Sequence, residues 1–468
     1  MRTRYRGNGK PVRIVAAVVA LAAAGVLTVT FVSGGGKGSA DAATSLTDYV
    51  PIQRVQPNVV RPAPGPAASR GRFTVDCGTN RIGKFSPDNP VAQPGIRNGA
   101  EHLHDFVGNI AITATSSDAD LEASGTTCRN GDRSSYFWPV VRIDHSVRDG
   151  EAVRQALAAT SGAVVCPSVR DRLPAVPAGA RTVVDRKLAE LDQLTAAAGR
   201  RLQASRGADP TLNNEVLGRL RERRAAVLVT IGNAIRGGHL VSLADCDVSY
   251  DGIHAGHTAA PSPAPSTAPA SPAPSGSALP EPQGRNRELP NNTGGIVRPS
   301  SVLIEYRGNA TAQVVPMPRL LRALTGDAKP TSRGPANARA AWTCSGFGDR
   351  LTDKYPICPA GRQVQRVHDF PGCWDGKNVD SANHRSHVAF ADQTTGACPA
   401  GFVAIPQLRV TISYRISRAE QLRGQYALDS FPEENHNPFS DHDDFVNVNS
   451  TRTMQRIATC LNQGRNCA

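Results

Sequence analysis

The chain has 468 residues, 40% of them hydrophobic, which is enough for one large domain or two ordinary ones around a buried core. Its formal net charge is +13 at pH 7, from 53 basic and 40 acidic side chains. It contains neither a Gly-x-Ser-x-Gly nucleophile elbow nor a His-Glu-x-x-His zinc helix, so the α/β-hydrolase and zincin classes are not indicated.

Residues 1–42 are interpreted as an export signal. An uncharged run at residues 14–32 follows the basic residues Arg2, Arg4, Arg6, Lys10 and Arg13. A signal peptide cleaved near Ala40-Asp41-Ala42 and an uncleaved signal anchor that contacts the membrane both fit this pattern. In both cases the basic flank stays inside, so we expect the rest of the chain to be extracytoplasmic, either secreted or anchored by this segment.

Short β-like runs follow a proline-rich stretch. Residues 43–70 have little apolar periodicity and predict a disordered tether. Residues 71–150 and 296–468 predict the two halves of a β-rich domain, because turn residues separate their short apolar runs. The predicted strands lie at residues 72–76, 109–115, 136–143, 302–306 and 402–416, and a short helix is predicted near residues 453–461.

The pattern between these halves is different. Residues 151–250 predict a helical hairpin, since leucines recur at helical spacing on both sides of a break at residues 207–210. Asp209 and Pro210 fit the N-cap and first position of the second helix, and Gly237-Gly238 fit its end. The basic excess at residues 181–236 fits a solvated helix face or attraction to an anionic polymer or lipid. Residues 251–295 are rich in Pro, Ala and Ser and predict a disordered insertion.

The chain has ten cysteines, an even number that is typical of an oxidising compartment. No Cys-x-x-Cys occurs, so we expect structural disulfides, at least four of them, rather than a redox or zinc motif. Cys166 and Cys246 bracket the predicted hairpin, and a disulfide between them would clamp its base. Sequence alone does not fix the connectivity.

Three segments concentrate histidine and carboxylate. They are residues 101–106, residues 370–387 and residues 441–447. On a strand, His102 and His104 would point to the same face, and on a helical turn His384 and His387 would share a face. Because polar side chains are costly to bury singly, we expect the three segments to converge on one cleft.

Several chemistries fit these residues. A divalent metal could be held by His102, His104, His384 and His442. Alternatively, Asp375 or Asp444 would act as a general acid or base. Trp374, His387 and Asp380 would contact a ligand, Trp374 by stacking on a sugar ring, although core packing also suits a tryptophan. The remaining alternative is that all these histidines and aspartates only organise loops.

The sequence resembles a family of secreted actinobacterial and fungal proteins catalogued as domain of unknown function nineteen-ninety-six. The resemblance rests on residues 102–109, 127–128 and 132–139, Tyr306-Arg307, residues 370–390, 396–399, 405–406 and 442–447, and Cys460-Leu461-Asn462. Two departures occur, at Tyr136-Phe137-Trp138-Pro139 and at Val448-Asn449. Because the matching segments flank residues 150–295, the resemblance implies one domain with insertions. The family name supplies no reaction.

We therefore expect a mainly β (α+β) fold, an antiparallel β-sandwich-like single domain with an inserted helical hairpin. The expected function is that of a cell-envelope protein, secreted or membrane-tethered, whose His/Asp-rich cleft binds or acts on a polysaccharide. Whether it is an enzyme stays open. The alternative is a non-catalytic glycan-binding or structural envelope protein. Nucleic acid is not expected as a partner.

Overall fold

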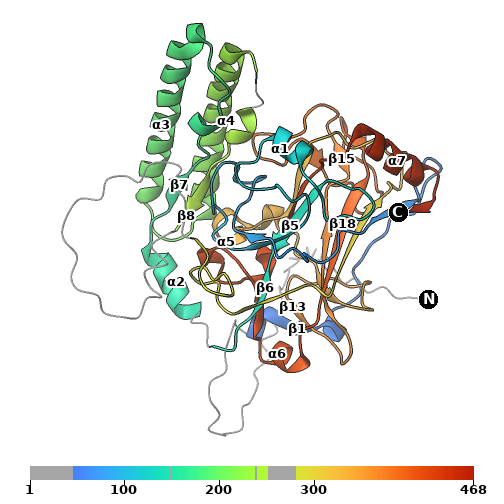
Figure 1. Ribbon diagram of the computed structural model, residues 1–468. Coiled ribbons are helices and arrows are strands. Elements are labelled where there is room, and N and C mark those ends of the chain that lie inside the picture. Colours follow the sequence, from blue (N-terminus) through green and yellow to red (C-terminus); the bar gives the residue numbers. More distant parts are fainter. Residues whose placement is uncertain (1–45, 147–149, 238–239, 251–280) are drawn as a thin grey trace, which may run out of the picture. The chain divides into compact units, whose positions relative to one another are not determined.

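A computed structural model describes residues 46–146, 150–237, 240–250 and 281–468 (Figure 1). These residues form a strand-rich α+β fold with several antiparallel sheets, which confirms the predicted fold class. The predicted export signal and most of the Pro/Ala/Ser segment lie outside the described residues. Within these ranges, no helix combines the length and the hydropathy that a membrane crossing requires.

The largest sheet joins strands from both ends of the chain. Its six strands run in the order β12-β14-β18-β10-β2-β21, antiparallel except for the β2–β21 pair. Along β18, Leu408, Val410 and Ile412 are buried while Gln407, Arg409 and Thr411 are half-buried, the alternation of a strand with one covered face. The strands are β12 (Trp342–Cys344), β14 (Val364–Asp369), β18 (Gln407–Tyr414), β10 (Ser301–Arg307), β2 (Arg72–Val75) and β21 (Asn466–Cys467).

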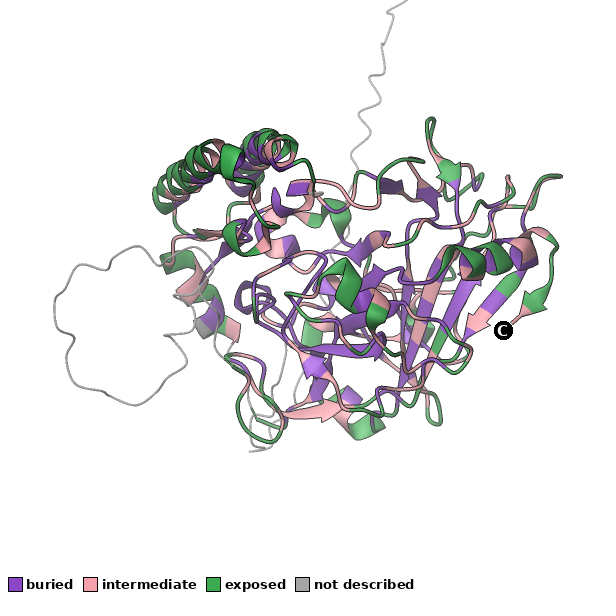
Figure 2. Cartoon of the chain, turned by 45° about the horizontal axis from the view of Figure 1, so that its top comes forward, coloured by how far each residue is buried: buried purple, intermediate pink, exposed green. Residues whose placement is uncertain are grey.

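A second sheet of five strands packs against the first. Its order is β11-β20-β5-β4-β3. The bounds are β11 (Arg322–Gly326), β20 (His442–Val446), β5 (Ser135–Pro139), β4 (His104–Gly108) and β3 (Phe85–Ser86). Every residue of β4, β5 and β20 is buried (Figure 2), so both faces of these strands are covered. One face meets the six-stranded sheet, where the hydroxyl oxygens of Tyr136 and Tyr306 lie 2.9 Å apart in a hydrogen bond. This is the sandwich core.

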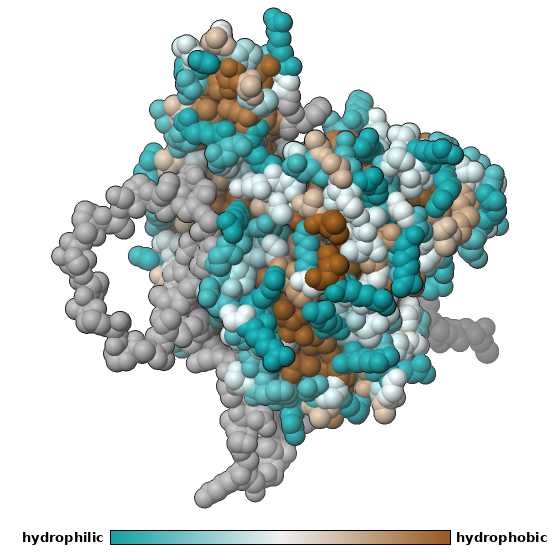
Figure 3. Space-filling view, viewed as in Figure 1, coloured by the Kyte–Doolittle hydropathy of each residue, from teal (hydrophilic) through white to brown (hydrophobic). Residues whose placement is uncertain are grey.

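The predicted hairpin consists of α3 (Arg181–Gln203) and α4 (Pro210–Ile235), which stand beside the sheets in Figure 1. Asp209 caps α4 by accepting hydrogen bonds from the backbone of Thr211 and Leu212, as the sequence predicted. The helix ends at Ile235, and its C-cap Arg236, one residue before the expected glycine pair, adopts a left-handed φ of 53°. In Figure 3, apolar residues gather along the hairpin and hydrophilic ones surround them, the pattern of two amphipathic helices packed on each other.

Smaller elements complete the fold. The helices are α1 (Asp118–Ala123), α2 (Gly150–Ala159), α5 (Pro330–Arg333), α6 (Arg418–Leu422) and α7 (Thr451–Asn462). The strands are β1 (Tyr49–Pro51), β6 (Val141–Ile143), β7 (Ala163–Val165), β8 (Asp247–Ser249), β9 (Gly295–Val297), β13 (Tyr355–Ile357), β15 (Cys373–Trp374), β16 (Val388–Ala389), β17 (Val403–Ala404) and β19 (Tyr426–Leu428). Short β7 and β8 pair at the base of the hairpin.

Three segments differ from the sequence prediction. Residues 46–70, expected as a disordered tether, contain β1, which pairs with β13, and Ile52 is 0% exposed in the core. Residues 281–295, expected to be disordered, are held by Asn292, which donates hydrogen bonds to the carbonyls of Glu101 and Ser430. Residues 109–115 form turns rather than a strand, because the Asn109 side chain binds the backbone of Leu121, Ala111 and Arg133.

All ten cysteines are paired. The disulfides are Cys77–Cys128, Cys166–Cys246, Cys344–Cys358, Cys373–Cys398 and Cys460–Cys467. The prediction of at least four disulfides is confirmed, and Cys166–Cys246 joins the chain next to β7 and β8 at the hairpin base. Five disulfides indicate an oxidising compartment.

Candidate functional site

Three histidines meet where β4 and β20 begin. The Nε2 atom of His442 lies 3.3 Å from Nε2 of His102 and 3.3 Å from Nε2 of His104. Strand β5 lies between β4 and β20, and Pro139 of β5 is paired with His104. Antiparallel β5 and β20 pair Asp444 with Phe137. Two residues further along the same register, His442 lies opposite Pro139, on the side of β5 away from His104. The two histidines therefore point to the same face of the sheet and meet across a proline.

This histidine cluster is closed off from solvent. The three residues are 1%, 0% and 6% exposed, and the rings of Phe431 and Phe137 pack edge-on against His102 and His104. Burial, together with the neighbouring imidazoles, lowers the pKa of His102 and His104 well below the usual range. Burial also lowers the pKa of His442, to about 4. All three imidazoles are therefore neutral at pH 7.

The tautomer of His442 is fixed by the backbone. Its Nδ1 lies 2.9 Å from the carbonyl oxygen of Ser440, an acceptor, so the proton of the neutral ring must sit on Nδ1. Its Nε2 then carries a lone pair that points at the other two imidazoles. This is the orientation in which a histidine ligates a metal.

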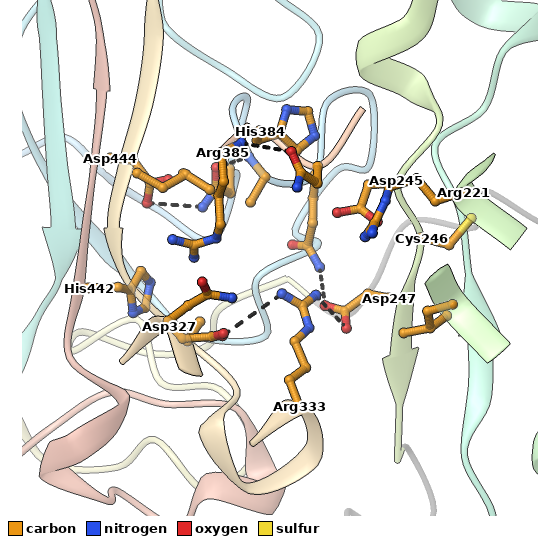
Figure 4. A pocket seen from close by; sticks show the side chains of 18 of the residues that line it. Arg221, Asp245, Cys246, Asp247, Asp327, Arg333, His384, Arg385, His442 and Asp444 are labelled. Carbon is orange, nitrogen blue, oxygen red and sulfur yellow. Dashed lines mark hydrogen bonds and ion pairs between the residues drawn. The ribbon is translucent and has the colours of Figure 1, made fainter. Parts of the chain in front are cut away.

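His442 also lines a pocket of about 500 Å³ between the β-rich part and the hairpin (Figure 4). The walls come from the ends of β11 and β20, the loop at residues 383–386, α5 and α4. Ionisable side chains are well represented in the walls and include Asp245, Asp247, Asp327, Asp443, Asp444, Arg221, Arg333, Arg385 and His384. Such a pocket suits a polar ligand rather than an apolar one.

Five pocket-lining side chains keep a buried polar atom that has no hydrogen-bond partner among the described residues. The atoms are Gln93 Oε1, Asp327 Oδ2, His384 Nε2, Asp443 Oδ1 and Asp444 Oδ1. An unsatisfied buried polar atom costs about 1–3 kcal/mol, so native structures contain few of them. Their concentration around one pocket indicates that a ligand or water supplies the missing partners.

Asp444 and Asp443 occupy different environments although they are neighbours. Asp444 accepts a hydrogen bond from Asn89 Nδ2 at 3.1 Å, and burial together with the Asp443 charge raises its pKa well above the usual range. Asp443 lies 2.8 Å from Nδ1 of His368 on β14. Burial lowers the pKa of His368, but Asp441 and Asp443 outweigh it and raise that pKa to about 9. Arg366 also pairs with Asp441, so β14 and β20 are joined by a buried ion network.

His384 is placed apart from the histidine cluster, although we expected it to share a metal with the other three. Its Nδ1 contacts Asp380 at 2.9 Å, and it faces the pocket. Burial opposes its charge, but the Asp380 carboxylate raises the pKa of His384 overall. Among the described residues, the set of side chains with metal-ligand spacing is His102, His104 and His442.

The other predicted site residues organise the loop at residues 374–387 instead of lining the pocket. Asp375 accepts hydrogen bonds from the backbone of Lys377 and Asn378, and Trp374 Nε1 donates to the carbonyl of Asn378. His387 places one nitrogen 2.7 Å from the Arg322 carbonyl and the other 3.0 Å from Ser381 Oγ. The five histidines expected in one cleft are therefore not all together. His102, His104 and His442 form one cluster, whereas His384 and His387 belong to the loop at residues 374–387.

Sequence reasoning did not identify the basic and acidic residues that come from the hairpin and α5. Arg333 forms a 2.8 Å ion pair with Asp247 of β8, and Lys329 forms one of 3.0 Å with Glu433. Arg221 of α4 lies 3.4 Å from Asp245. The sequence signal that could have indicated them is the pair of aspartates, Asp245 and Asp247, on either side of Cys246. All three residues line the pocket.

The family model described as "Domain of unknown function (DUF1996)" matches residues 286–448. Over these residues the match agrees with the family indicated by the sequence motifs, and it includes the loop at residues 370–387 and all the pocket-lining residues of β20. The match does not extend to His102 or His104. No curated protein and no solved structure matches the chain.

Proposed function

We propose that this is an extracytoplasmic cell-envelope protein whose pocket binds and acts on a polysaccharide. The observation that carries the proposal is the set of unpartnered polar atoms around the pocket, with Asp444 Oδ1 and His384 Nε2 among them. Sugars are dense in hydroxyl groups that both donate and accept, so they complement a pocket that offers carboxylates, guanidinium groups and an imidazole.

Within this proposal Asp444 is the residue that exchanges a proton with the substrate. It lies on β20, an interior strand of the five-stranded sheet, and is one of the residues that line the pocket. One carboxylate oxygen accepts a hydrogen bond from Asn89, and the other is buried with no partner among the described residues. A carboxyl group whose pKa is raised by burial, in the wall of a pocket, is of the kind that serves as a general acid or base. Asp375, the other predicted catalytic residue, is occupied with its own turn, so we assign it no chemical step.

The alternative is that the pocket binds a glycan without turnover. It shares every binding contact with the enzyme proposal and differs in the role of Asp444. In a binding protein, Asp444→Asn would keep much of the affinity because the amide still forms hydrogen bonds. In an enzyme the same change removes the proton exchange.

The test is a screen of the purified, exported protein against envelope polysaccharides, with reducing-end release and binding both measured. Wild type is expected to release product, and Asp444→Asn to reduce the rate by about 10²–10⁴-fold, the usual contribution of a general acid or base. Asp392→Asn, a change of the same chemistry at an exposed turn, serves as the matched control and should leave the rate unchanged. Binding without release by wild type would establish the alternative, and neither binding nor release would overturn the proposal.

A further inference from the structure

We infer that His102, His104 and His442 bind one transition-metal ion of the Zn²⁺ class through their Nε2 atoms. His104 and His442 lie on two strands of one sheet and His102 lies two residues before β4, and the ligand atoms of the three side chains lie within 4.8 Å of one another. The inference does not depend on the polysaccharide proposal, since metal binding is measured directly.

The spacing fits a tetrahedral ion. Zn–N bonds of about 2.0–2.1 Å at the tetrahedral angle place two ligand nitrogens about 3.3–3.4 Å apart. The two Nε2–Nε2 distances to His442 are both 3.3 Å. An ion at the centre of the cluster therefore requires no rearrangement of the ligand nitrogens around His442.

Hydrogen bonding alone does not satisfy this cluster. Because His442 donates from Nδ1 to Ser440, its Nε2 has a single lone pair and can accept one hydrogen bond. Two imidazole nitrogens approach that lone pair, so at least one contact would be made without a hydrogen bond. A cation that accepts all three lone pairs removes this conflict.

The donor set and its surroundings select the class of metal. Imidazole nitrogen suits Zn²⁺, Cu²⁺, Ni²⁺ and Fe²⁺, whereas Mg²⁺ and Ca²⁺ prefer oxygen. The phenyl rings of Phe431 and Phe137 fix the planes of His102 and His104, and the Ser440 carbonyl fixes His442. Three histidines with a fourth position left open is the arrangement of catalytic zinc. His442 is the member of the cluster that lines the pocket, so the ion would lie at the pocket boundary.

The experiment uses the full chain exported in oxidised form, stripped with a chelator, dialysed and titrated with Zn²⁺. Metal analysis should find one equivalent per chain, and Mg²⁺ should not bind. His104→Gln and His442→Gln should lose the bound equivalent, while His387→Gln should keep it. His387 is the matched control because it is also buried, yet both its nitrogens contact protein oxygens.

A spectroscopic measurement keeps the test decisive if the buried variants fail to fold. Wild type loaded with Cu²⁺ should give an electron paramagnetic resonance signal split by several nitrogen nuclei. A signal from oxygen ligands, or no stoichiometric binding of Zn²⁺, Cu²⁺ or Ni²⁺ by wild type, would overturn the inference. So would a folded His104→Gln/His442→Gln double variant that retains its ion.

Discussion

Two kinds of buried histidine can be told apart among the described residues by what their ring nitrogens contact. In His387 and His436 both nitrogens lie within 3.0 Å of protein oxygens, so the ring serves as a crosslink between loops. In His442 one nitrogen is bound to the backbone and the other faces two further imidazoles. The difference in contacts, rather than in burial, separates a structural histidine from a candidate ligand.

Lys84 should make the stability of the protein depend on pH. Its Nζ donates hydrogen bonds to the carbonyls of Ile110 and Ile112, and burial lowers its pKa from 10.5 to about 8, although Asp88 opposes the shift. The unfolded chain therefore binds this proton more tightly than the folded one. Between about pH 8 and 10.5 the unfolded state holds more protons, and the free energy of unfolding should rise with pH in that window.

The comparison is between wild type and Lys84→Met, unfolded in urea at several pH values from 8 to 10.5. The stability of wild type should increase relative to the variant across this window. Lys377→Met, at an exposed lysine, is the control and should follow wild type. Parallel profiles for wild type and Lys84→Met would show that Lys84 is not the group responsible.

At the scale of elements, β6 holds the segment that follows the undescribed residues 251–280. Arg142 of β6 forms a 2.7 Å ion pair with Asp429, and its guanidinium also donates to the carbonyls of Asn286, Arg287 and Gly294. Both partners of the ion pair are buried. One arginine thus connects β6, the loop after β19 and residues 286–294.

Replacing Arg142 by Met should destabilise the protein by about 3–5 kcal/mol, because the buried carboxylate of Asp429 would lose its ion-pair partner. Urea unfolding with the disulfides intact measures the loss. Arg154→Met breaks an ion pair with Glu151 whose side chains are 64% and 61% exposed, and such a surface pair contributes about 1 kcal/mol or less. If the two variants lost equal stability, the buried network around Arg142 would have no special role.

Elements with a local sequence signal were predictable, and those fixed by distant contacts were not. The capped helix α4 and the alternating strand β18 follow from spacing and capping chemistry within a few residues. Residues 46–54 have no such signal, and their order depends on Tyr49 and Ile52 meeting residues of β13 and the core. The His102–His104 pair was visible in the sequence, but its meeting with His442 depends on the β4-β5-β20 strand order.

At the scale of the whole chain, the disulfides differ in the length of loop that they close. Cys166–Cys246 has a sequence separation of 80 and encloses the hairpin, whereas Cys460–Cys467 has a separation of 7. The chain-entropy treatment assigns about 4–5 kcal/mol to the long loop and about 2 kcal/mol to the short one. The long disulfide also fixes the pocket edge, because Cys246 and its neighbours Asp245 and Asp247 line the pocket.

The Cys166→Ala/Cys246→Ala variant should therefore lose roughly twice the unfolding free energy that Cys460→Ala/Cys467→Ala loses. Urea unfolding of the two double variants gives this ratio. Hydrogen exchange should locate the damage: amides of β7 and β8 should lose protection in the first variant, while those of β18, which belongs to a different sheet, keep theirs. Equal losses of stability, or unchanged protection of β7 and β8, would mean that packing of α3 and α4 against their surroundings holds the pocket edge without the bridge.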